Sequence, residues 1–109
     1  MALPIIKEII ERFPDIDTSW FNYGVCLDKI GEHKEAADAF IRAHELKIKD
    51  YGIHYRIIRS LILAEDYATL HEFVDYIFQT FKEEREQIIE SPELESLWNR
   101  EEFKHLKEQ

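Results

Sequence analysis

The sequence has few residues that interrupt helices. Among its 109 residues only three are glycine and three are proline, and no stretch alternates apolar and polar side chains as a half-buried strand would. Apolar residues instead recur every three or four positions, with strong helix formers such as glutamate, lysine and alanine between them. The sequence therefore predicts an all-α fold, and its length suits one domain over residues 1–109.

Cysteine and long apolar runs are scarce as well. The one cysteine, Cys26, leaves no internal disulfide framework and is expected to be a small buried side chain on a helix. Charged residues occur within the first twelve positions and interrupt the apolar core that a signal peptide would need. No run reaches the ~20 apolar residues of a membrane span. The expected location is the cytoplasm, with no membrane partner.

Positive charge is in the minority. The chain has 14 lysines and arginines against 23 aspartates and glutamates, a net charge of -9. Binding to a phosphate backbone depends on a broad basic surface that releases counterions. Nucleic acid is therefore not an expected partner.

The residue patterns of enzymes and metal sites are missing too. His71 and Glu72 lack the second histidine, four residues on, of a zinc-binding helix. The sequence has no glycine-rich phosphate loop and no serine nucleophile elbow. Paired carboxylates such as Glu83 and Glu84 fit solvated helix faces. We expect no catalytic residue, cofactor or metal, and a fragment of an enzyme is the weakest of the function classes.

The sequence does contain an internal pattern with a period of 34 residues. In the segment 20–48, Trp20 stands one turn before Gly24, so a second helix can approach closely beside an aromatic wedge. Small, large and small side chains at Ala36, Phe40 and Ala43 supply that second helix. The positions 34 residues away are mostly apolar: Ala2, Ile6, Ile9 and Pro14 upstream, and His54, Ile57, Ile58, Leu61, Leu70, Val74 and Ile77 downstream.

This pattern resembles the tetratricopeptide repeat (TPR), a helix-turn-helix unit of about 34 residues. The resemblance implies a right-handed superhelix of helical hairpins, with about two repeats, a flanking N-terminal helix and a C-terminal cap. Its segments are the second helix of an incomplete repeat (1–15), the best-formed repeat (17–50), a degenerate repeat (51–84), and a helix extension with the cap (85–109). The expected helices lie near 2–13, 17–30, 33–47, 51–64 and 67–89, with one or two short helices from 93 onward.

Several boundaries have local signals. Pro14 ends the first helix, and the cluster Asp17-Thr18-Ser19 offers N-capping oxygens to the second. Gly31 fits the left-handed position after that helix. Ser91 and Pro92 begin a new helix as cap and first residue.

The segment that follows resembles the closing segment of many bacterial TPR proteins. Its apolar residues are expected to cover the last repeat, as terminal repeats require. They are Leu94, Leu97, Trp98, Phe103 and Leu106.

Basic residues concentrate between Arg42 and Arg59. This stretch of the sequence contains five lysines and arginines and only two acidic residues. In TPR proteins the first helix of each repeat lines a concave surface that holds extended peptides. The resemblance places a mixed apolar and basic set there, with Arg56 and Arg59 suited to an acidic side chain or a C-terminal carboxylate. The set is Phe21, Asn22, Val25, Tyr55, Arg56, Arg59 and Ile62.

Two interpretations of this face remain open. In the first, the protein is an interaction adaptor that captures a peptide or partner segment in the concave groove. In the second, the apolar residues are covered, either by helices of the same chain or by a second copy, and the protein is a structural self-assembly module such as a homodimer. TPR clamps for chaperone tails use lysines and asparagines over three repeats. Only Asn22 and Arg56 stand at comparable positions here, so that activity is not expected.

Overall fold

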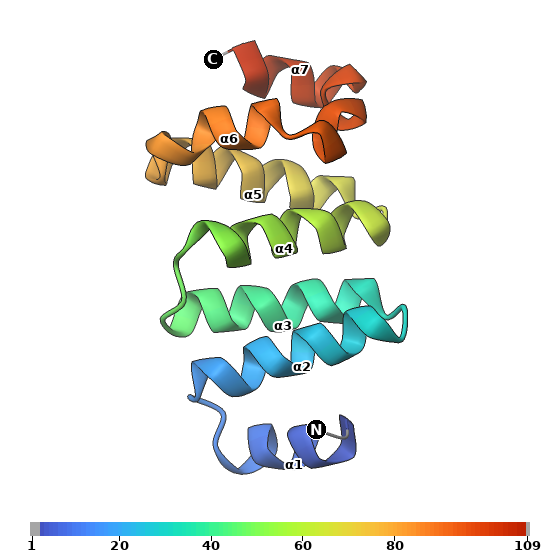
Figure 1. Ribbon diagram of the computed structural model, residues 1–109, viewed down its shortest axis with the longest axis vertical. Coiled ribbons are helices and arrows are strands. Elements are labelled where there is room, and N and C mark those ends of the chain that lie inside the picture. The colour runs from blue at the N-terminus through green and yellow to red at the C-terminus, as the bar shows by residue number, and fades with distance from the viewer. Residues whose placement is uncertain (1–2, 109) are drawn as a thin grey trace. The chain divides into compact units, whose positions relative to one another are not determined.

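The computed structural model describes residues 3–108, and every regular element in that range is a helix (Figure 1). The prediction of an all-α fold is confirmed. By their internal contacts, the residues divide into two compact units, the first ending at Asp66 and the second beginning at Tyr67.

The first unit contains four helices that alternate in direction (Figure 1). They are α1 (Leu3–Arg12), α2 (Asp17–Lys29), α3 (His33–Leu46) and α4 (Tyr51–Leu63), close to the predicted ranges. Each helix packs against the next one along the chain, so the unit is a series of helical hairpins. Fully buried side chains at helical spacing, such as Ala36, Phe40 and Ala43 on α3, form its core.

A close approach between helices in this unit lies between Gly24 on α2 and Phe40 on α3. A Cβ atom at Gly24 would stand 2.7 Å from Cε1 of the Phe40 ring, and Phe40 is fully buried. The repeat pattern predicted that Trp20 is the aromatic wedge beside Gly24, and that was wrong. Trp20 is only half-buried, and its Nε1 donates to the carbonyl of Pro14 at 2.7 Å. Phe40 is the ring that meets the glycine because its helix faces Gly24 directly.

The predicted cap of α2 also differs. Ile16 is the N-cap residue, without a side-chain cap hydrogen bond, and Asp17 already lies in the first turn. There its carboxylate still interacts favourably with the helix dipole. Cys26 is half-buried rather than fully buried.

Two turns of the first unit, 34 residues apart, have the same backbone geometry. Gly31 has φ +85° and Glu65 has φ +57°, both in the left-handed region. The amide of Gly31 donates to Asp28 and that of Glu65 to Ile62, while the next amide in each turn donates to Leu27 and Leu61 respectively. This arrangement satisfies the last carbonyls of α2 and α4 in the manner of a Schellman-type helix end.

A buried polar network joins α2, α3 and α4. The hydroxyl of Ser60, which is fully buried, donates to both carboxylate oxygens of Asp28 at 3.0 and 2.9 Å. The Nδ1 atom of His33 lies 2.9 Å from the same carboxylate. The network fixes the three helices to one another through one shared acceptor group.

The second unit has one long helix followed by shorter elements. They are α5 (Tyr67–Thr80), the 3₁₀ helix η1 (Lys82–Glu84), α6 (Arg85–Glu90), the 3₁₀ segment η2 (Pro92–Asn99) and α7 (Glu101–Glu108). The prediction of one helix over 67–89 was wrong, because Phe81 takes a non-helical conformation (φ -118°, ψ 64°) and the chain changes direction there. Ser91 and Pro92 do begin η2, although Ser91 makes no side-chain cap hydrogen bond.

The apolar residues predicted for the cap are buried in the second unit. Leu94, Leu97, Trp98, Phe103 and Leu106 are each at most 5% exposed. The ring of Phe103 lies 5.5 Å from that of His71 and 6.5 Å from that of Tyr67, so α7 covers part of α5.

Candidate partner-binding site

An open groove of about 500 Å³ lies between α2 and α4 in the first unit. Its walls come from the first half of each helix and from the connection between α3 and α4. The lining residues are Thr18, Phe21, Asn22, Ile48, Asp50, Gly52, Ile53 and Arg56.

Arg56 lies beside a pair of aromatic rings in this groove. The guanidinium carbon of Arg56 is 5.3 Å from the centroid of the Phe21 ring and 5.9 Å from that of Phe40. The two rings are 5.5 Å apart and tilted by 60°. Cation–π attraction holds the guanidinium plane in place without using its N–H donors. Within residues 3–108, Arg56 makes no ion pair, so these donors are available to a carboxylate.

Asp50 gives the groove a negative group at the start of α4. One of its carboxylate oxygens accepts from the amide of Ile53 at 3.0 Å, which caps the helix. A carboxylate ligand is therefore repelled at Asp50 and attracted at Arg56, and this polarity orients it within the groove.

The groove contains three of the seven residues that the sequence placed in the site: Phe21, Asn22 and Arg56. The other four lie elsewhere on the same two helices, Val25, Tyr55 and Ile62 half-buried and Arg59 exposed. The predicted sharing of one carboxylate by Arg56 and Arg59 stays a prediction. Ile48 and Asp50 were missed because only the first helices of the repeats were considered and not the connection before α4. The other lining residues that the sequence did not place in the site are Thr18, Gly52 and Ile53.

A second group of polar side chains, His44 and His54, is buried and does not line the groove. The imidazole rings of His44 and His54 meet edge to face at 4.9 Å, both buried. Burial, together with smaller electrostatic contributions from Lys49 and His54 in the same direction, lowers the pKa of His44 to about 4. His44 is therefore neutral near pH 7, and its Nδ1 lies 3.1 Å from the carbonyl of Ile48.

The Asp28 network has the residue types of a hydrolase triad but not its geometry. The Ser60 hydroxyl donates to the Asp28 carboxylate and not to the imidazole of His33. A triad needs the imidazole between the other two groups, and an accessible hydroxyl. The network thus joins helices rather than activating a nucleophile.

Two further features concern the described residues only. No group of three or more His, Cys, Asp or Glu side chains among them is arranged to hold a metal ion. None of the helices in residues 3–108 combines the length and the apolar character needed to cross a membrane.

No protein-family model, curated protein or solved structure matches this chain. The TPR resemblance therefore depends on the residues and helical hairpins of the chain itself.

Proposed function

We propose that the protein is a TPR-like interaction adaptor of the cytoplasm that captures a peptide or partner segment in the groove between α2 and α4. An acidic side chain or a C-terminal carboxylate of the partner pairs with Arg56, and apolar side chains rest on Phe21 and Ile48, which line the groove and are both half-buried. No catalysis, nucleic acid, membrane or cofactor belongs to this function.

The observation that carries the proposal is the position of Arg56 over Phe21 and Phe40. An arginine kept in one orientation by aromatic rings loses less conformational entropy on binding than a free one. The apolar surface around it supplies desolvation, which strengthens a charge-assisted hydrogen bond.

The hairpin geometry supports the repeat assignment. Two helix ends separated by 34 residues share both their left-handed residue and their hydrogen bonds. This spacing equals the length of a TPR unit. A glycine against a packed ring, as at Gly24 and Phe40, gives the close helix pairing that such a hairpin needs.

A displayed library of random peptides tests the proposal directly. Selection on the parent protein, with counter-selection on Arg56→Glu, is expected to enrich peptides that combine an acidic or free C-terminal carboxylate with apolar residues. Their affinity for Arg56→Glu should fall at least about tenfold, since a hydrogen bond to a charged group contributes ~1.5–3 kcal/mol. Failure to enrich any peptide, or equal binding to the folded variant, contradicts the proposal.

Two matched charge reversals sharpen this experiment. Arg59→Glu makes the same charge reversal on the same helix, but Arg59 does not line the groove. It therefore measures whether the predicted binding surface extends beyond the groove to Arg59. Lys29→Glu, exposed at the end of α2, controls for net charge and should leave binding unchanged. Equal losses from Lys29→Glu and Arg56→Glu would mean that long-range charge, not the groove, drives binding.

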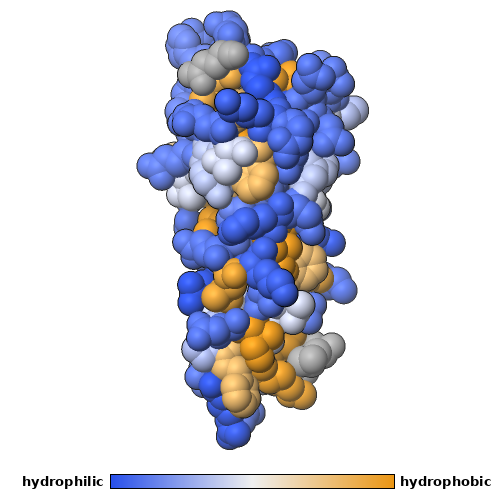
Figure 2. Space-filling model, turned by 90° about the vertical axis from the view of Figure 1, so that its left-hand side faces the viewer, coloured by the Kyte–Doolittle hydropathy of each residue, from blue (hydrophilic) through white to orange (hydrophobic). Residues whose placement is uncertain are grey.

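Self-assembly is the second candidate function, and one observation favours it. Ile5, Phe13 and Ile16 are 53%, 58% and 40% exposed. Apolar side chains gather over α1 and the start of α2 on the face shown in Figure 2. Exposed apolar patches often mark protein interfaces, so this end of the first unit is the surface that a second copy would cover.

A further inference from the structure

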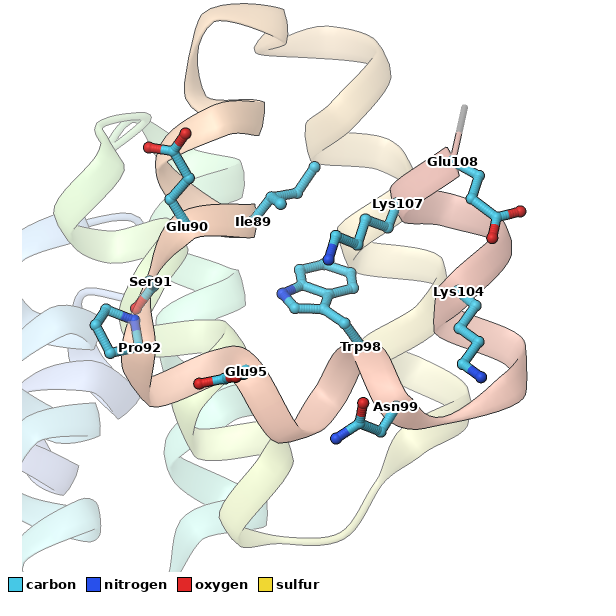
Figure 3. Close-up of a pocket in the computed structure, with 10 residues that line it drawn as sticks. All are labelled: Ile89, Glu90, Ser91, Pro92, Glu95, Trp98, Asn99, Lys104, Lys107 and Glu108. Carbon is cyan, nitrogen blue, oxygen red and sulfur yellow. The ribbon is translucent and has the colours of Figure 1, made fainter.

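A larger pocket, of about 770 Å³, lies within the second unit (Figure 3). It is bounded by the segment from Ile89 to Pro92 on one side and by α7 on the other, with Trp98 between them. The volume falls in the range of small-molecule sites, ~300–1,000 Å³. This pocket shares no residue with the groove between α2 and α4.

Trp98 has a buried donor with no partner in the described part of the chain. Its side chain is 5% exposed, and Nε1 makes no hydrogen bond. A buried N–H without an acceptor destabilises the fold, so it calls for an explanation. In Figure 3 the nitrogen edge of the indole faces the space between Glu95 and the segment from Ile89 to Pro92. An acceptor entering this space would satisfy the donor.

The indole is held in position by its neighbours. Trp98 stacks on Phe78 at 6.0 Å with an interplanar angle of 25°, and the guanidinium of Arg85 lies 5.3 Å from the Phe78 ring. The same guanidinium donates to the carbonyl of Lys107. Arg85 thus ties α7 to the aromatic stack, and the donor is preorganised rather than mobile.

Lys107 supplies a positive charge at the same place. Its side chain extends from α7 toward the indole in Figure 3, and its ammonium has no ion pair among residues 3–108. Lys104, one turn earlier, also lines the pocket but is 3.9 Å from Glu101. An ammonium beside an N–H donor forms a pair of donors that suits a carboxylate.

The remaining lining defines which anion fits. Glu90, Glu95 and Glu108 also border the pocket, and their charge repels a divalent anion such as phosphate more than a singly charged one. Ile89 and Pro92 add apolar surface that an inorganic ion leaves unused.

We propose that this pocket binds a small organic monocarboxylate with an apolar body. The carboxylate accepts hydrogen bonds from the Trp98 indole and from Lys107, and the apolar body rests on Ile89 and Pro92. Because Nε1 itself is covered, the ligand reaches it after neighbouring side chains shift, and the exposed Lys107 has the most freedom to do so.

The test follows the indole N–H resonances of the ¹⁵N-labelled chain by NMR during titration with phenylacetate. Trp20 serves as the internal reference, since its Nε1 already donates to Pro14. Phenylacetate is expected to move the Trp98 resonance saturably, with half-saturation near or below ~1 mM. The neutral analogue phenylacetamide should bind at least about tenfold more weakly, and inorganic phosphate should leave the Trp98 resonance unmoved.

Two variants complete the test. Lys107→Met keeps the side-chain stem and removes the charge, so it should weaken phenylacetate binding at least about tenfold. Lys7→Met, on α1, is the matched control and should change nothing. The proposal is overturned if the Trp98 resonance stays still up to ~20 mM phenylacetate, if the amide binds as well as the acid, or if Lys107→Met binds as tightly as the parent.

Discussion

The contact between Gly24 and Phe40 sets the spacing of the α2–α3 hairpin. Gly24→Ala would place a Cβ atom 2.7 Å from a fully buried ring, so the ring or a helix must shift. Overpacking of this kind costs ~1–3 kcal/mol, more than the helix propensity gained from alanine. We expect denaturant melts to show this loss.

Gly52→Ala is the matched control for that variant. Its Cβ atom would meet only Oδ1 of Asp50, at 3.3 Å, in an exposed first turn of α4. We expect a change in the free energy of unfolding within ~0.5 kcal/mol. Equal effects at Gly24 and Gly52 would mean that the hairpin does not depend on close packing at Phe40.

Glu65 has a backbone conformation that suits glycine. Its φ of +57° repeats the +85° of Gly31 at the corresponding turn. Glu65→Gly should therefore stabilise the fold by about 1 kcal/mol, and Gly31→Ala should destabilise it by a similar amount. Thermal melts of the two single variants should show a higher melting temperature for Glu65→Gly and a lower one for Gly31→Ala. Destabilisation by Glu65→Gly would show that the side chain of Glu65 contributes more than its backbone strain costs.

His44 gives the fold a dependence on acid. Its pKa is lowered from 6.5 to about 4 in the folded chain, so the unfolded chain takes up the proton first. Stability is therefore unaffected above about pH 6.5 and declines as the pH falls toward about 4, by up to about 3 kcal/mol. Unfolding titrations across this range should show a smaller decline in His44→Gln than in the parent. An equal decline of the unfolding free energy in the parent and in His44→Gln would show that His44 is not the group responsible for the acid dependence.

Among the elements, the helices of the first unit were the most predictable. Their apolar spacing and the Gly31 signal are local, and the observed ranges agree with the predicted ones within a few residues. The break at Phe81 could not be predicted, because neither glycine nor proline marks it. The segment after it makes contacts that are distant in sequence, such as the hydrogen bond from Arg85 to the carbonyl of Lys107 on α7. Tertiary contacts of this kind override local helix propensity.

The candidate site was predictable in part for the same reason. Helical spacing and the cluster of basic residues indicated Phe21, Asn22 and Arg56. That Arg56 lies over two aromatic rings depends on how α2, α3 and α4 pack, and a sequence alone does not give this. The unpaired indole of Trp98 likewise has no signal in the sequence.

We expect the second unit to need η2 and α7, the elements after Glu90, in order to stay folded and soluble. Ending the chain at Glu90 removes Leu94, Trp98 and Phe103, which are buried there. We expect exposed apolar surface, aggregation and loss of helicity beyond the residues removed. Circular dichroism and solubility measure this outcome. A shortened chain that stays soluble, with its remaining helices intact, would show that η2 and α7 are an appendage rather than a cap.

For the whole molecule, the state of association separates the two candidate functions. The adaptor proposal predicts a monomer in size-exclusion chromatography with light scattering, because the groove serves a different partner. Self-assembly through the apolar end of α1 predicts a dimer that Phe13→Glu converts to monomer, since a charge placed in an apolar interface is costly. Phe13 is 58% exposed, so the fold should tolerate this change. A dimer that is unaffected by Phe13→Glu would contradict the predicted monomer and would show that the apolar end of α1 is not the dimer interface.

Chemical shifts of the backbone amides, followed while a selected peptide is added, test whether the groove between α2 and α4 binds the partner. Binding in the groove predicts shifts that centre on Thr18, Phe21, Asn22, Ile53 and Arg56, with little change in α1 or around Trp98. Arg56→Glu should need at least about tenfold more peptide for the same shifts, while its unbound spectrum stays that of a folded chain. Shifts centred on α1, on the pocket of the second unit or on the opposite face of α2 and α4 would contradict the assignment of the groove as the partner-binding site.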